Sequence, residues 1–173
     1  EDGSATLAKA MLSDVLLTLE QCEALRSVRK ILLYAPGDQE GLKHMQRIFT
    51  ELRMQAAHDS SKWKLDSWLL LPLKSVGRNL QSSNLGDLLA DSLTRIRERL
   101  EVVRNGNPMG SVAYLGMDCP SLPLQDLYNG LVVEHDAAIL CPADDGGYGM
   151  LTVPFTADPE KTFASGLHWS HPL

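Results

Sequence analysis

Hydrophobic positions along the chain switch repeatedly between the spacing of a helix and that of a buried strand. Apolar residues recur at three- and four-residue steps in the segments 4–22, 38–52, 85–103 and 123–131, which predicts helices. Runs that are apolar almost throughout lie at 30–36, 68–74, 111–118, 137–143 and 148–154, and they predict strands. Runs without alternation are typical of parallel strands buried on both faces, so we predict an α/β fold, a three-layer α/β/α sandwich with a mainly parallel sheet.

The predicted helices also have start signals. Ser4 is a candidate N-cap of the first helix, whose apolar stripe would run through Leu7, Met11, Val15 and Leu19. Asp38 is a candidate N-cap of the second helix. The stretch from residue 158 to 173 starts like a short helix and has no strong periodicity after that.

Length and composition narrow the possible classes of protein. A chain of 173 residues suits one domain over 1–173, and no run approaches the roughly 18 apolar residues that a membrane span needs. The net charge of −6, without a basic run, argues against a nucleic-acid polymer as the main partner. Cys22, Cys119 and Cys141 have no CxxC spacing, so we expect reduced thiols in a cytoplasmic protein.

Carboxylates follow two of the predicted strands. Asp118 closes the segment 111–118, and Asp144 and Asp145 follow the segment 137–143. In open α/β sheets ligands bind beyond the carboxyl ends of the strands, where these oxygens could share one Mg²⁺ or Mn²⁺ ion. Gly146 and Gly147 would let the backbone approach a ligand closely. Two alternatives stay open, because D-D-G-G also suits a hairpin turn and Asp118 could be a cap or turn residue.

The segments "YLGMDCPSLPLQDL" and "AAILCPADDGGYGMLTV", followed by Trp169 and Ser170, carry a family resemblance. They resemble the GT-A-type nucleotide-diphospho-sugar transferases, in particular the branch described as radical-SAM/selenodomain-associated transferases. The three matching motifs are G-x-D-x-P-x-L at 116–122, P-A-x-D-G-G-Y at 142–148 and the closing W-S, so the resemblance spans about 81–170. The segment "QSSNLGDLLADSL" is also similar, although residues 87–89 depart from the family's usual continuation.

The resemblance implies transfer of a sugar from a nucleotide-diphosphate donor with the help of Mg²⁺ or Mn²⁺. Asp118 would be a metal ligand, and Asp145 would either complete the metal shell or act as a base toward an acceptor hydroxyl. Tyr148 would contact the acceptor or would be a core or turn residue. The remaining residues that would line the acceptor pocket are Gly146, Gly147, Trp169 and Ser170. His168 and His171 lie beside Trp169 and Ser170 in the sequence; they would be loop residues or, as the alternative, metal ligands or acid/base groups.

The chain departs from the family at its amino-terminal end. The family opens with a strand and a glycine- and Lys/Arg-bearing loop that binds the nucleotide, whereas residue 1 lies at the helix that follows. A trimmed segment, a degenerate protein and a misleading resemblance would each explain this. An unpaired strand edge would also favour a homodimer. We therefore consider a glycosyltransferase, a nucleotidyltransferase of the same fold, and a non-catalytic binding or scaffold domain.

Overall fold

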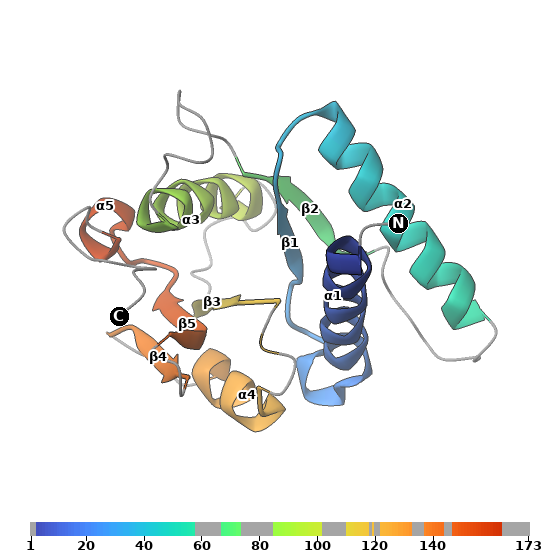
Figure 1. Cartoon of the computed structure of the whole chain (residues 1–173). Helices are drawn as coiled ribbons and strands as arrows, with labels where there is room; N and C mark the ends of the chain where they lie inside the picture. Colours follow the sequence, from blue (N-terminus) through green and yellow to red (C-terminus); the bar gives the residue numbers. More distant parts are fainter. Residues whose placement is uncertain are drawn as a thin grey trace. The chain divides into compact units, whose positions relative to one another are not determined.

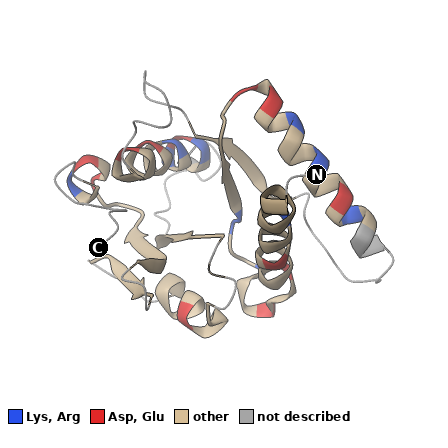
Figure 2. Cartoon of the chain, viewed as in Figure 1, with Lys and Arg blue, Asp and Glu red and all other residues tan. Residues whose placement is uncertain are grey.

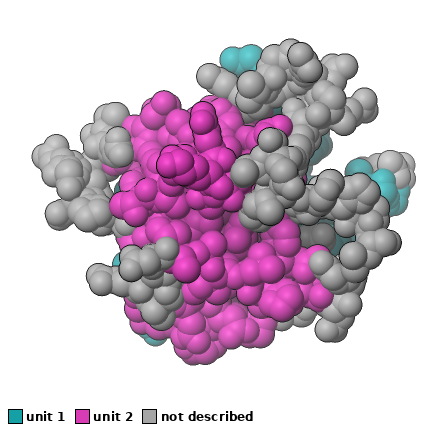
Figure 3. All heavy atoms as spheres, turned by 90° about the vertical axis from the view of Figure 1, so that its left-hand side faces the viewer, with its two compact units in different colours: residues 1–72, 117–121 teal, residues 73–116, 122–173 magenta. Residues whose placement is uncertain are grey.

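The computed structural model describes most of the chain (Figure 1). The described residues are 3–57, 67–73, 85–101, 110–117, 119, 122–132, 137–143 and 147–163. The chain divides into two compact units, which we call unit 1 (residues 1–72 and 117–121) and unit 2 (residues 73–116 and 122–173; Figure 3). Each unit is described separately below, and a single domain over 1–173 stays a prediction.

Unit 1 contains two long helices and a parallel pair of strands. Its elements are α1 (Gly3–Gln21), the short 3-10 helix η1 (Glu23–Leu25), β1 (Ile31–Tyr34), α2 (Gln39–Ala57) and β2 (Leu69–Pro72). The strands β1 and β2 run parallel and in register from the Ile31–Leu69 pair to the Tyr34–Pro72 pair. Pro72 ends β2, as the sequence predicted, because proline has no N–H to donate to a further ladder bond.

The core of unit 1 lies between its helices and one face of its strands. Leu12 and Leu16 of α1 pack against Ile48, Phe49 and Leu52 of α2. The paired strand residues Leu32 and Leu70, together with Met45 and Trp68, extend this cluster. The apolar stripe predicted for residues 38–52 is therefore confirmed.

The predicted stripe of the first helix lies beside the buried one, since Met11, Val15 and Leu19 are half-buried whereas Leu12 and Leu16 are buried. Leu7 is 61% exposed, whereas Leu16 is 1% exposed and belongs to the core. Apolar residues occur on more than one face of α1, so periodicity alone allowed two stripes, and packing against α2 selects the one through Leu12 and Leu16. Ser4 lies inside the helix and does not precede it.

The start of α2 follows the sequence prediction. The backbone N–H of Gly41 donates to Asp38 Oδ1 at 2.8 Å, which satisfies one of the free donors of the first turn. A Cβ atom on Gly41 would lie 2.0 Å from the carbonyl oxygen of Pro36. Only glycine therefore fits at this position of the first turn.

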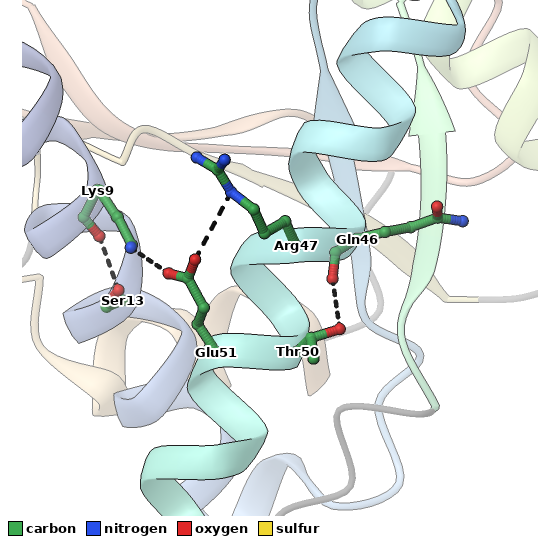
Figure 4. A network of polar contacts seen from close by, with 6 residues as sticks. All are labelled: Lys9, Ser13, Gln46, Arg47, Thr50 and Glu51. Carbon is green, nitrogen blue, oxygen red and sulfur yellow. Dashed lines mark hydrogen bonds and ion pairs between the residues drawn. The ribbon is translucent and has the colours of Figure 1, made fainter.

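An ion-pair network joins α1 and α2 at the surface (Figure 4). Lys9 donates to the carboxylate of Glu51, and Arg47 Nε lies 3.6 Å from Glu51 Oε1. The hydrogen bond from Lys9 lowers the pKa of Glu51 below its usual value. Because the network is exposed to solvent, it adds little to stability.

Unit 2 contains an antiparallel sheet with helices around it. Its elements are α3 (Leu85–Glu101), β3 (Ser111–Leu115), α4 (Leu124–Val132), β4 (Ile139–Pro142), β5 (Tyr148–Pro154) and α5 (Pro159–Thr162). The strand order is β3-β5-β4, and β5 runs antiparallel to both neighbours. The described strands thus form a parallel pair and a three-stranded antiparallel sheet. They do not form the mainly parallel sheet that the sequence predicted. A parallel neighbour of β4 would need a long crossover, and only residues 143–147 connect β4 to β5.

Helices cover both faces of the sheet of unit 2. On one face, Leu151 and Val153 pack against Leu89 and Leu93 of α3 and against Phe163. On the other face α4 approaches so closely that a Cβ atom on Gly130 would lie 3.0 Å from Thr152 Oγ1 and 3.1 Å from Met150 Cε. This burial on both faces explains the apolar character of the central strand β5, whose residues from Gly149 to Val153 are buried.

Charged residues gather on the helices (Figure 2). The five described strands contain no Lys, Arg, Asp or Glu. The mixed α/β class predicted from the sequence is confirmed. None of the described helices is long and apolar enough to cross a membrane.

Candidate functional site

The strands that lead to the candidate aspartates end at the same edge of the unit 2 sheet. Since β3 and β4 are each antiparallel to β5, they run parallel to one another. Leu115 near the end of β3 and Cys141 near the end of β4 are both paired with Met150. Both strands therefore end at this shared edge, and Asp118 and Asp145, which follow these strands in the sequence, lie outside the described residues.

The structure places two of the predicted site residues. Gly147 and Tyr148 lie together at the end of the hairpin formed by β4 and β5. The other predicted residues fall outside the described part of the chain. They are Asp118, Asp144, Asp145, Gly146, His168, Trp169, Ser170 and His171. Their assigned roles stay predictions.

The D-D-G-G stretch connects two antiparallel strands. The backbone N–H of Ala143 donates to the carbonyl of Gly147 at 2.9 Å, which closes the end of the hairpin. The structure thus shows a hairpin of β4 and β5, and the turn interpretation of residues 144–146 stays a prediction because they lie outside the described residues. It does not conflict with a binding role, because hairpin ends often carry functional residues.

A β-bulge lies next to this turn. Cys141 is paired with Met150, but the next residue, Pro142, is paired with Tyr148, so Gly149 has no partner residue on β4. The Tyr148 side chain packs against the core cluster that contains Leu151, on the face covered by α3. Its burial raises the pKa of the phenol. Tyr148 thus has a core contact at its ring.

A buried polar pair lies on the same face and was not predicted. Ser92 is 1% exposed, and its Oγ lies 2.8 Å from the Leu89 carbonyl oxygen and 3.1 Å from the Tyr114 hydroxyl. Burial raises the pKa of Tyr114 to about 12, although the bond with Ser92 partly opposes this. The signal in the sequence was a serine on the apolar face of a predicted helix, three residues after a core leucine.

Arg97 ties α3 to the chain that follows β5. Its Nε donates to the Phe155 carbonyl oxygen at 2.6 Å, and Nη2 donates to the Ala157 carbonyl oxygen. The guanidinium also lies over the Phe155 ring, 5.7 Å from its centroid. These contacts could not be predicted from the sequence, because Arg97 belongs to the polar side of the predicted helix. Its contacts are those of a structural residue.

A second polar cluster lies in unit 1. Glu20 Oε1 accepts hydrogen bonds from Lys30 Nζ at 2.8 Å and from Trp68 Nε1 at 2.7 Å. The side chains of Glu20 and Lys30 are 4% and 11% exposed. Lys30 and Trp68 each directly precede a strand, so the cluster joins the end of α1 to the starts of β1 and β2. Its position at the amino ends of the strands indicates a structural role.

Among the described side chains, no three His, Cys, Asp or Glu residues are grouped so that they could hold a metal ion. Cys22, Cys119 and Cys141 are half-buried, and none of them forms a disulfide within the described residues. Asp118 and Asp145, the predicted ligands, lie outside the described residues.

Residues 18–171 match the model of a family described as "Uncharacterized protein conserved in bacteria (DUF2064)". The chain belongs to this family. No curated protein sequence matches this family member. The family assignment covers all three motifs that the sequence analysis singled out.

A solved structure with a similar fold comes from Desulfovibrio desulfuricans G20. That protein is provisionally described as a nucleotide-diphospho-sugar transferase. The TM-score is 0.58 at 18% sequence identity, and the similarity covers 94% of this chain and 58% of the other. The family member therefore spans little more than half of that protein's length. At this identity the similarity shows the fold, which agrees with the predicted resemblance at the level of the broad family.

Proposed function

We propose that the protein is a glycosyltransferase of the GT-A type, which transfers a sugar from a nucleotide-diphosphate donor with the assistance of Mg²⁺ or Mn²⁺. The observation that supports this most directly is the shared edge at which β3 and β4 end, since Leu115 and Cys141 are both opposite Met150. Both candidate aspartates follow this edge in the sequence. The fold similarity to a provisional nucleotide-diphospho-sugar transferase points the same way.

The proposed roles follow from the chemistry of the side chains. Asp118 binds the metal ion through its carboxylate, which is the hard oxygen ligand that Mg²⁺ and Mn²⁺ prefer. Asp145 either completes the metal shell or takes the proton from an acceptor hydroxyl. The residues proposed to line the substrate pocket are Gly146, Gly147, Tyr148, Trp169 and Ser170.

In the proposed reaction an acceptor hydroxyl oxygen bonds to the anomeric carbon of the donor sugar. The bond between that carbon and the diphosphate breaks, and the nucleoside diphosphate leaves with the bonding electrons. The hydroxyl proton goes to a base, for which Asp145 is the candidate. A bound divalent cation would supply charge stabilisation at the leaving diphosphate.

Two other functions remain distinguishable by experiment. A nucleotidyltransferase of the same fold would release pyrophosphate from a nucleoside triphosphate, whereas the glycosyltransferase releases a nucleoside diphosphate. A non-catalytic domain would form neither product. A cytoplasmic location and a homodimer are also part of the proposal, and sedimentation velocity would test the dimer.

The first test is thermal unfolding with Mn²⁺ and a panel of nucleoside diphosphates, triphosphates and nucleotide sugars. A ligand at about 100 times its dissociation constant adds about 2.7 kcal/mol to stability, which raises the midpoint by about 5 °C or more. We expect such a rise with one nucleotide, and only when the metal is present. Asp118→Asn should abolish it without changing the midpoint of the free protein.

The matched control is Asp14→Asn, which removes the same charge from an exposed position on α1. This variant should bind like the wild type. A wild-type protein whose midpoint moves with none of these ligands would contradict the transferase proposal. Unchanged binding in Asp118→Asn would contradict the metal role of that residue.

A further inference from the structure

The β-bulge at Gly149 determines which face of the sheet carries the Tyr148 side chain. In a regular strand, residues two apart point to the same face. Met150 lies beneath α4, since its Cε is 3.1 Å from a Cβ placed on Gly130, whereas Tyr148 packs against the cluster under α3. Residues 148 and 150 thus lie on opposite faces, and the one residue inserted relative to β4 accounts for the change.

This change places an aromatic ring at the base of the hairpin end. Tyr148 is the first residue of β5 and directly follows Gly147, whose carbonyl oxygen accepts the Ala143 N–H at 2.9 Å. The ring packs on the cluster formed by α3, β5 and Phe163, which includes Leu93 and Val153, each 0% exposed. The last closed pair of the hairpin is thereby attached to the most buried part of unit 2.

We infer that Tyr148 is a positioning residue, whose ring, turned by the Gly149 bulge onto the α3 face, fixes the end of the β4–β5 hairpin for ligand binding. The ligand-binding part of this inference rests on the proposed function, whereas the anchoring part does not. Without the bulge, the ring would point toward α4 and the hairpin end would lose its attachment to the α3 cluster. The proposed anchoring contact is that of the ring, so phenylalanine, which keeps the ring, should replace tyrosine in this role.

The test is hydrogen exchange at the Ala143 amide, measured by NMR for the wild type, Tyr148→Ala and Tyr148→Phe. We expect Tyr148→Ala to raise the exchange rate of the Ala143 amide by about tenfold or more, because the hairpin end should open more often without the ring contact. Amides in the middle of β5 should keep their rates, and Tyr148→Phe should restore the wild-type rate at Ala143. The matched control is Tyr128→Ala, at a half-buried tyrosine on α4, which should leave Ala143 unchanged.

Two outcomes would overturn the anchoring role. One is an unchanged Ala143 rate in a folded Tyr148→Ala variant. The other is an equal acceleration at all amides of unit 2, which would make Tyr148 an ordinary core residue. If Tyr148→Ala does not fold, Tyr148→Leu retains apolar volume without the ring and is measured in the same way.

A second measurement separates this inference from the proposed function. The affinity for Mn²⁺ with the nucleotide that stabilises the wild type should fall about tenfold in Tyr148→Ala and should keep its wild-type value in the control Tyr128→Ala. If the wild type binds no nucleotide, the proposed function fails, and the exchange rates still decide the anchoring role. Wild-type affinity in Tyr148→Ala would overturn the link between anchoring and ligand binding.

Discussion

At the scale of single residues, close backbone approaches set the strictest demands on the sequence. Gly41 lies in the first turn of α2, where the carbonyl oxygen of Pro36 occupies the space that a Cβ atom would need. Gly3, in α1, has no atom within 4 Å of the same position. The two glycines therefore form a matched pair, one required by packing and one not.

We expect Gly41→Ala to lower the free energy of unfolding by about 3 kcal/mol, because backbone atoms must move to admit the methyl group. This loss exceeds the gain of about 1 kcal/mol that alanine brings inside a helix. Gly3→Ala should leave stability unchanged or raise it slightly. Urea unfolding of both variants measures the difference, and equal midpoints would contradict the clash.

At the scale of elements, polar side chains attach helices and strands to one another. The cluster of Glu20, Lys30 and Trp68 joins α1 to the starts of β1 and β2 and is nearly closed to solvent. The pair of Glu23 and Arg26 in the next turn is exposed, with 82% of the Glu23 side chain accessible. The two ion pairs thus differ in how far their side chains are buried.

Glu20→Gln should destabilise the protein by about 3 kcal/mol, because it leaves the Lys30 ammonium buried without its counter-charge. Glu23→Gln should change stability by about 0.5 kcal/mol or less, since an exposed pair is screened by water. Chemical denaturation of the two variants gives the comparison. A small effect of Glu20→Gln would mean that Lys30 reaches water when its partner is neutral.

The cap of α5 gives a prediction about pH. The backbone N–H groups of Lys161 and Glu160 donate to Asp158 Oδ1 at 3.2 and 3.1 Å. The bond from Lys161 contributes most to lowering the Asp158 pKa below 3.8. A carboxyl with a lowered pKa stabilises the folded state above its unfolded value, and this contribution is lost as the pH falls through the folded value.

Asp158→Asn keeps an acceptor oxygen but cannot ionise. The stability advantage of the wild type over this variant should therefore be present at neutral pH and shrink as the pH falls below 3.8. Unfolding measured across this range tests the expectation, with Glu160→Gln as the control, because that carboxylate does not cap the helix. A constant difference across the range would show that the charge at the cap is unimportant.

At the scale of the whole molecule, the proposed activity depends on residues that follow the ends of β3 and β4 in the sequence. We expect Asp145→Asn to lower turnover by about 100-fold or more, since either proposed role requires the carboxylate. Product formation with the donor found by thermal unfolding measures this. Retained nucleotide affinity with lost turnover would identify the base, and loss of both would identify a metal ligand. Full turnover in Asp145→Asn would contradict both roles.

Local patterns predicted much of the fold and part of the candidate site. The spacing of apolar residues and the turn residues predicted the helix that starts after Asp38, the buried stripe of α3 and the two strands around D-D-G-G. These features depend on neighbours only a few residues apart, so the sequence by itself determined them.

Only the tertiary structure decided which faces and directions these elements take. Packing against α2 selected the Leu12 and Leu16 side of α1. The bulge at Gly149 turns the Tyr148 side chain toward α3. In unit 1, Lys30 and Trp68 both donate hydrogen bonds to the buried carboxylate of Glu20. Each of these outcomes depends on contacts between residues far apart in the chain, about which local spacing carries no information.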